Sequence, residues 1–151
     1  IGKHNRQALQ ELGFDNIFYV PDIKTSMLLS SRFFLERGNP KIHWDAGVNA
    51  LPLRTALEKN IKLIFYAEHG ESFYGGKILH SKSDKIRDYT EVLENQVGDD
   101  PENWVDDKIK LDALNSYIYP NSEELKKRQI TAYYFSYFEK WDTYENYKYI
   151  K

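Results

Sequence analysis

The hydrophobic residues of this chain follow helical spacing in several stretches and form one nearly continuous run. The run spans residues 61–66, where branched and aromatic side chains follow one another with little alternation. Such a run is typical of a strand in a parallel sheet that is covered on both faces. We therefore expect a buried, central strand here, followed directly by a polar loop.

The residues before this run alternate between helical and extended patterns. We expect a helix over residues 3–12 that Gly13 ends, a short strand over 16–20, and a helix from Asp22 to Gly38. A third helix should begin at Asn49 as its N-cap, tolerate Pro52 in its first turn and end at Asn60. The expected inward residues are Ile23, Met27, Leu28, Phe34 and Leu35 in the second helix, and Leu53, Ala56 and Leu57 in the third. This order predicts a parallel α/β sheet with helices on its faces.

Residues 80–112 differ from the rest, because ten acidic residues stand against five lysines and arginines. We interpret residues 80–120 as an acidic helical insertion at the surface, with a solvated face and a specific basic partner as the two alternatives. From residue 121 the chain should return to the core, with a helix from Ser122, a covered strand within 130–138 and a last helix from Asp142, with Tyr147 and Ile150 inward. Residues 1–151 would then form one α/β domain fragment, of which 1–79 and 121–151 are the core and which belongs to a larger protein.

Composition excludes several classes of protein. A chain of 151 residues suits one domain, and a net charge of −2 provides no basic field for nucleic acid. No apolar run approaches the roughly 20 residues of a membrane-spanning helix, and no signal peptide opens the chain. The absence of cysteine excludes disulfides, thiolate zinc sites and cysteine nucleophiles. We expect a cytoplasmic protein.

The loop after the apolar run carries the candidate chemistry. Ligands of open α/β sheets bind beyond the carboxyl ends of the strands, and the groups at that position are Glu68, His69, Glu71, Tyr74, Gly75 and Gly76. Two acids three residues apart suit a cation, and glycines let backbone N–H groups approach a ligand closely. A tight turn with solvated carboxylates is the structural alternative.

Four stretches, taken in order, also resemble a known family. They are residues 1–5 with 13–17 and Pro21; 47–49 with Pro52 and Ala56; 64–71 with 74–76; and 133–138 with 140–142 and 146–147. Together they resemble the N-acetyl sugar amidotransferases of bacterial surface-polysaccharide, lipopolysaccharide (LPS) and flagellin-glycan synthesis, which are PP-loop ATP pyrophosphatases. Ala67, His69 and Phe73 depart from the family pattern, in which glycine, asparagine and an acid are usual. More remotely, the third stretch resembles asparagine synthetases, where an aspartate associated with pyrophosphate and magnesium matches Glu71.

This resemblance implies a Rossmann-like sheet of the adenine nucleotide alpha hydrolase type, here incomplete, and the use of ATP and Mg2+. The substrate would be a nucleotide-linked N-acetyl sugar, whose acetamido oxygen is activated as an adenylate before ammonia displaces AMP. Ammonia would come from a separate glutaminase subunit, since the chain has no cysteine nucleophile. The implied catalytic residues are Glu71 and Glu68, with Glu71 also the magnesium ligand. His69 is a catalytic candidate from its place in the loop and not from the resemblance. The expected nucleotide or sugar contacts are Gly70, Gly75, Gly76 and Asn49.

One departure from the superfamily bears on activity. The Ser-Gly-Gly-x-Asp-Ser loop that holds ATP phosphates does not occur in these 151 residues. We expect it to precede Ile1 in a longer enzyme, so that this chain alone is inactive. Two alternatives stay open, namely another PP-loop ligase acting on tRNA or a small acid, and a non-catalytic binding or scaffold module. The sequence does not identify the sugar or the oligomeric state, and a homo-oligomer is one of the alternatives.

Overall fold

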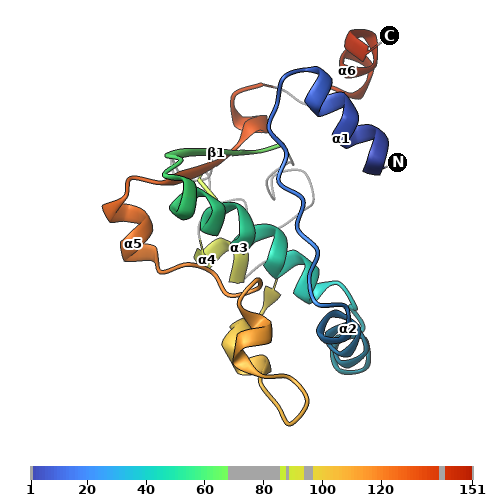
Figure 1. Cartoon of the computed structure of the whole chain (residues 1–151), viewed down its shortest axis with the longest axis vertical. Helices are drawn as coiled ribbons and strands as arrows, with labels where there is room; N and C mark the ends of the chain where they lie inside the picture. Colours follow the sequence, from blue (N-terminus) through green and yellow to red (C-terminus); the bar gives the residue numbers. More distant parts are fainter. Residues whose placement is uncertain (1, 68–85, 88, 94–96, 140–141, 151) are drawn as a thin grey trace.

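A two-stranded parallel sheet joins the two halves of the chain in the computed structural model. The structure describes residues 2–67, 86–87, 89–93, 97–139 and 142–150. Strand β1 (Leu63–Tyr66) pairs with β2 (Thr131–Tyr134), and each strand ends on a tyrosine opposite the other. Helix α3 (Ile42–Lys59) crosses below these strands and contacts β1 (Figure 1). The described residues thus form a mixed structure of helices and parallel strands, as the alternation predicts.

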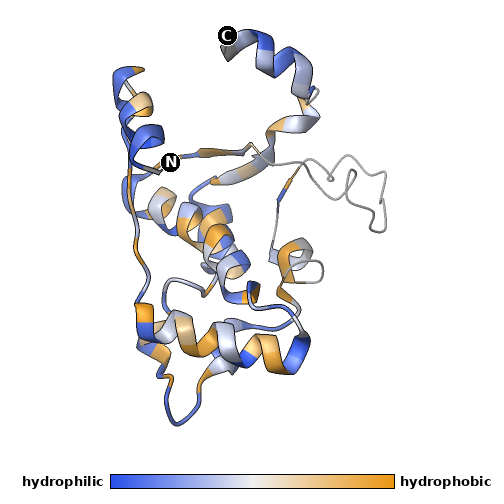
Figure 2. Ribbon diagram, turned by 90° about the vertical axis from the view of Figure 1, so that its right-hand side faces the viewer, coloured by the Kyte–Doolittle hydropathy of each residue, from blue (hydrophilic) through white to orange (hydrophobic). Residues whose placement is uncertain are grey.

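The other helices surround this unit. They are α1 (Gly2–Glu11), α2 (Ile23–Arg37), α4 (Tyr89–Val92), α5 (Ser122–Lys127) and α6 (Thr143–Ile150), with 3-10 turns at Pro101–Trp104, Leu111–Leu114 and Phe135–Tyr137. Helices α1 and α6 lie at the end of the molecule opposite α2 (Figures 1 and 2). Among the described helices, none has the length and apolar composition that crossing a bilayer requires.

Local capping chemistry fixes the predicted helix ends. Asp22 accepts a hydrogen bond from the Thr25 backbone N–H at 2.8 Å and begins α2. Gly38 ends α2 and Asn60 ends α3, both in the left-handed conformation, with φ of 68° and 56°. Gly13 follows α1 with a φ of 80°. These predictions are confirmed, because a cap depends on a few neighbouring residues only.

Two glycines provide a matched test of helix geometry. We expect Gly38→Ala to lower the free energy of unfolding by about 1 kcal/mol, because its left-handed φ strains any residue with a Cβ. Gly47→Ala, inside α3, should instead raise it by about 0.5–1 kcal/mol. Its new Cβ would meet the Tyr117 ring at 3.5 Å, an ordinary contact. Urea unfolding of both variants checks this, and a stabilised Gly38→Ala would contradict the assigned cap.

The first hydrophobic core lies between α2, α3 and the acidic stretch. Its buried members are Leu29, Phe33, Ile42, Ala46, Val92, Val97, Trp104, Ile109, Leu114 and Tyr117. Trp104 is 0% exposed and lies edge-on to Phe33 at 4.8 Å. The expected solvent-facing helical insertion is therefore wrong for the described residues 97–117, which are mostly irregular. Apolar side chains spaced among the acids turn inward there, while the carboxylates face water. The division of the chain at residues 80 and 120 stays a prediction.

The second core covers one face of the sheet. It is formed by Leu53, Ala56, Tyr66, Leu125, Ile130, Ala132 and Tyr134, which confirms the inward face predicted for the end of α3. On the other face, Leu63 and Phe65 are 49% and 48% exposed. Burial on both faces is thus wrong for β1, and within the described residues β1 has β2 as its one paired neighbour, not a central position. A continuous apolar run does not specify which face is covered.

Three further expectations differ from the structure. Residues 16–20 are extended but pair with no strand among the described residues. The buried face of α2 is Thr25, Leu29 and Phe33, while all five residues expected inward are exposed, namely Ile23, Met27, Leu28, Phe34 and Leu35. Hydrophobic residues recur along much of α2 (Figure 2), so its sequence offers two apolar faces, and packing against Trp104 selects one. Tyr147, expected inward, is exposed on α6.

Helix α3 begins eight residues earlier than predicted, since its N-cap is Lys41 instead of Asn49. Pro52 therefore lies inside the helix and not in its first turn. Proline lacks the N–H that would bond the carbonyl one turn before it, a loss that usually ends or kinks a helix. Contacts of α3 with both hydrophobic cores maintain the helix across this position.

Candidate functional site

Most residues of the predicted site lie outside the part of the chain that the structure describes. These are Glu68, His69, Gly70, Glu71, Gly75 and Gly76. Their roles stay predictions. The described chain leads directly to them, since β1 ends at Tyr66, two residues before Glu68. The carboxyl ends of β1 and β2 are therefore the part of the predicted site that can be examined.

Asn49 is the one predicted site residue that the structure describes. Its side chain is 1% exposed, and its Nδ2 donates to the Asp45 backbone carbonyl at 2.8 Å. The Asn49 backbone carbonyl accepts a hydrogen bond from the Tyr66 hydroxyl at 3.2 Å. Asn49 thus joins the middle of α3 to the carboxyl end of β1. Its contact with a nucleotide or sugar stays a prediction.

Arg87 lies at the same edge of the sheet and was not predicted from the sequence. Its Cζ is 4.1 Å from the ring centroid of Tyr66 and 5.1 Å from that of Tyr134. Its backbone N–H donates to the Ala132 carbonyl at 3.0 Å, and the residue is 4% exposed. A guanidinium over two aromatic faces is held by cation–π attraction. The tyrosines that end both strands were visible in the sequence, but the parallel register that brings them together was not.

The described groups at this edge are one cation and two tyrosines, and all three are buried. The Tyr66 hydroxyl already donates to the Asn49 carbonyl, so these residues contribute a buried positive charge held on two aromatic rings. Among the described residues, no group of three or more histidines and carboxylates is arranged to hold a metal ion. The carboxylate expected to bind Mg2+, Glu71, lies outside the described residues, and the use of ATP stays a prediction.

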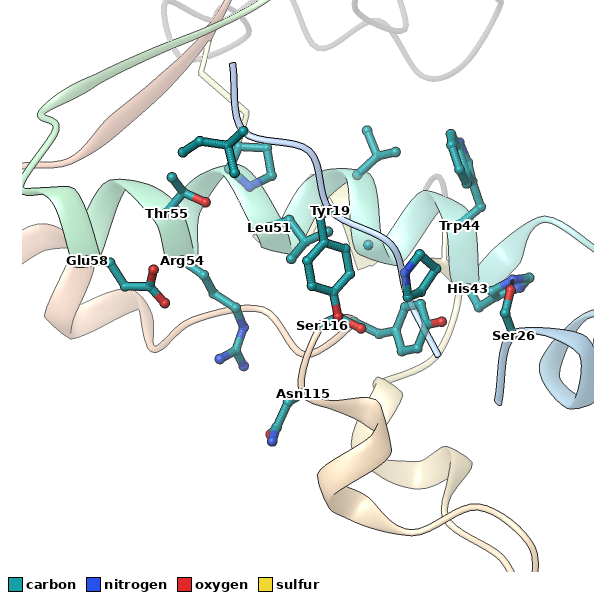
Figure 3. A pocket seen from close by; sticks show the side chains of 16 residues that line it. Tyr19, Ser26, His43, Trp44, Leu51, Arg54, Thr55, Glu58, Asn115 and Ser116 are labelled. Atoms are coloured by element: carbon teal, nitrogen blue, oxygen red, sulfur yellow. Dashed lines mark hydrogen bonds between the residues drawn. The ribbon is translucent and has the colours of Figure 1, made fainter. Parts of the chain in front are cut away.

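A second feature is an open cleft of about 880 Å³ on another side of α3 (Figure 3). One wall is the extended segment with Ile17 and Tyr19, and the other is α3 with Leu51 at its middle. The turn at residues 115–117 closes one side. Clefts of this size with mainly apolar walls are typical of small-molecule sites.

Polar groups are grouped at one end of this cleft. The Ser26 hydroxyl lies 3.0 Å from His43 Nε2, and the His43 ring lies edge-on to Tyr117 at 5.8 Å. Burial lowers the pKa of His43, and a hydrogen bond with the Pro40 backbone raises it by a smaller amount. Burial also raises the pKa of Tyr117. This end of the cleft is therefore uncharged at neutral pH.

The lowered pKa of His43 predicts a dependence of stability on pH. The unfolded chain, in which histidine has a pKa near 6.5, binds a proton more readily than the folded one. The free energy of unfolding should then be fully maintained above that pH and decrease as the pH falls through 6.5. Urea unfolding at pH 7.5 and 5.5 should show a smaller decrease for His43→Gln than for the unmodified chain. His4→Gln, on the exposed face of α1, is the control. Equal pH dependence in all three would contradict the assignment.

The sheet edge and the cleft use different faces of α3. Leu53 and Ala56 pack on the sheet, whereas Leu51, Arg54 and Thr55 line the cleft. Compared with known proteins, the chain matches no family model and no curated protein. The resemblance to the N-acetyl sugar amidotransferases therefore stays a prediction from four sequence stretches.

Proposed function

We propose that this chain is part of an ATP-dependent amidotransferase that converts the acetamido group of a nucleotide-linked sugar into an acetamidino group. The reaction would be a step in the synthesis of LPS O-antigen or of flagellin glycans. The ordered set of four sequence stretches supports this proposal, and a Rossmann-like sheet of which β1 and β2 are two strands is part of it.

The observation that supports it most directly is the carboxyl edge of the sheet. β1 and β2 are parallel, and their final tyrosines hold the Arg87 guanidinium. Ligands of open parallel sheets bind beyond this edge, and the buried Arg87 gives it a positive potential. The Glu68 to Gly76 segment follows β1 in the sequence, so its acids and glycines would meet the ligand there.

The proposed reaction has two steps. The acetamido oxygen attacks the α-phosphorus of ATP and pyrophosphate leaves, which converts a poor leaving group into a good one. Ammonia then adds to the acetamido carbon, and AMP departs with the former amide oxygen, leaving the acetamidine and one proton. Glu71 would bind Mg2+ with the pyrophosphate or orient the ammonia. A glutaminase subunit would supply ammonia, since this chain has no cysteine.

The test is an assay of the enzyme that contains this chain, with ammonium chloride as the ammonia source. Nucleotide-linked N-acetyl sugars should release AMP only when ATP and ammonia are both present, and mass spectrometry should show one oxygen replaced by NH. AMP release that requires tRNA or a small acid would indicate another PP-loop ligase. No AMP release with any of these substrates would indicate a binding or scaffold module.

A further inference from the structure

The cleft beside α3 is a separate feature that the proposed amidation does not use. Its long axis follows the helix, with Arg54 and Glu58 toward one end and His43 and Ser26 at the other (Figure 3). Residues 43 and 54 are separated by roughly 16 Å along an α-helix. The cleft is thus long enough for an extended molecule.

The middle of the cleft is apolar. It is lined by Ile17 of the extended segment and by Val48, Leu51 and Pro52 of α3. Ile17 is 65% exposed, so much of its side chain is open to the cleft and to solvent. An apolar ligand body would remove this surface from water.

Arg54 provides the positive charge at one end, where the exposed Glu58 carboxylate also lines the cleft. The Arg54 Nε donates to the Ile118 backbone carbonyl at 2.9 Å. This bond fixes the orientation of the guanidinium and does not use its other N–H groups. The ion pairs found in the described part of the chain include none with Arg54. A half-buried arginine on an apolar cleft is suited to bind a carboxylate or a similar anion.

The opposite end provides neutral hydrogen-bonding groups. The Ser26 hydroxyl and the His43 imidazole lie 3.0 Å apart, beside Tyr117. A hydroxyl or carbonyl group suits this end, whereas a second charge would be desolvated without a countercharge.

We propose that this cleft binds an elongated amphipathic organic anion. Its anionic group pairs with Arg54, its apolar body lies between Ile17 and Leu51, and a neutral polar group reaches Ser26. The inference does not rest on the proposed amidotransferase function, because the cleft and the sheet edge lie on different faces of α3.

The test uses the full 151-residue chain and 12-hydroxydodecanoate as the probe, kept below its micelle concentration. Titration calorimetry should show saturable binding, and amide NMR shifts should localise it to Gly47, Thr55 and Ser116. The uncharged analogue 1,12-dodecanediol should bind at least about tenfold more weakly, since a charge-assisted hydrogen bond is lost. Dodecanoate, which lacks the terminal hydroxyl, should bind several-fold more weakly, and Ser26→Ala should abolish that difference.

Two arginine variants distinguish binding in the cleft from non-specific attraction of the anion to basic surface residues. Arg54→Gln should weaken 12-hydroxydodecanoate by about tenfold and leave the diol unaffected. Arg128→Gln, at the exposed C-cap of α5, should leave both within twofold. Equal binding of acid and diol to the unmodified chain would overturn the proposal, even if Arg54→Gln failed to fold. So would shifts centred on the exposed aromatic face at Phe65 and Tyr133, or no saturable binding.

Discussion

Replacing Trp104 by alanine should lower the free energy of unfolding by about 3–5 kcal/mol, the usual cost of emptying a large aromatic site in a core. Trp104 is 0% exposed, lies 4.8 Å from Phe33 and 6.1 Å from Tyr117, and joins the acidic stretch to α2. Arg32 strengthens the same junction by donating to the Trp104 backbone carbonyl at 2.9 Å. Because truncation leaves a cavity between segments distant in sequence, the loss should be large.

Two controls make this result specific. Trp104→Phe keeps most of the ring volume and removes an indole N–H that has no hydrogen-bond partner among the described residues, so it should cost much less than alanine. Trp44→Ala, at a position 59% exposed, should change stability by about 0.5 kcal/mol or less. Urea unfolding measures all three. A loss below about 1 kcal/mol for Trp104→Ala would mean that the acidic stretch is not part of the core.

Replacing Glu71 by glutamine should reduce turnover of the enzyme that contains this chain by about 10²-fold or more, near 3 kcal/mol of barrier. The change keeps the shape of the side chain and removes its charge. An ionised Glu71 would neutralise Mg2+ on the leaving pyrophosphate or orient ammonia, and glutamine can do neither well. Folding should be little affected, which an unfolding curve verifies.

Glu123→Gln is the matched control for this substitution. Glu123 is exposed on α5 and pairs with Lys126 at 2.9 Å, so its loss should leave turnover unchanged. The assay uses free ammonia, which removes the glutaminase from the measurement. Turnover of Glu71→Gln within threefold of the unmodified enzyme would leave residues 68–76 as a structural turn.

Local signals in the sequence predicted the helix ends well. The features that the sequence did not predict depend on packing between residues far apart in the chain. Asp22, Gly38 and Asn60 were identified because a cap is decided by a few neighbouring backbone groups. The buried face of α2 was not, because the helix has two apolar faces and Trp104, about seventy residues away in sequence, selects between them. The apolar residues of the acidic stretch were similarly not identified as core residues, because the excess of acids indicated a solvent-exposed segment.

The candidate site shows the same difference between features that local sequence patterns predict and features that depend on long-range packing. The position of β1 and its parallel pairing agree with the sequence pattern, so the edge where a ligand would bind was predictable. Arg87 was not, since it is one of five basic residues in an acidic stretch and meets its two tyrosines only through the strand register. The cleft beside α3 likewise depends on three segments that are separate in the sequence.

The most direct test of the proposed chemistry is the fate of one oxygen atom. A nucleotide-linked N-acetyl sugar labelled with oxygen-18 in its acetamido group is incubated with the enzyme that contains this chain, ATP and ammonia. If ATP activates the acetamido oxygen as an adenylate, the label must appear in the phosphate of AMP, one atom for each acetamidine formed. Label in inorganic phosphate, or unlabelled AMP alongside unchanged sugar, would contradict the account.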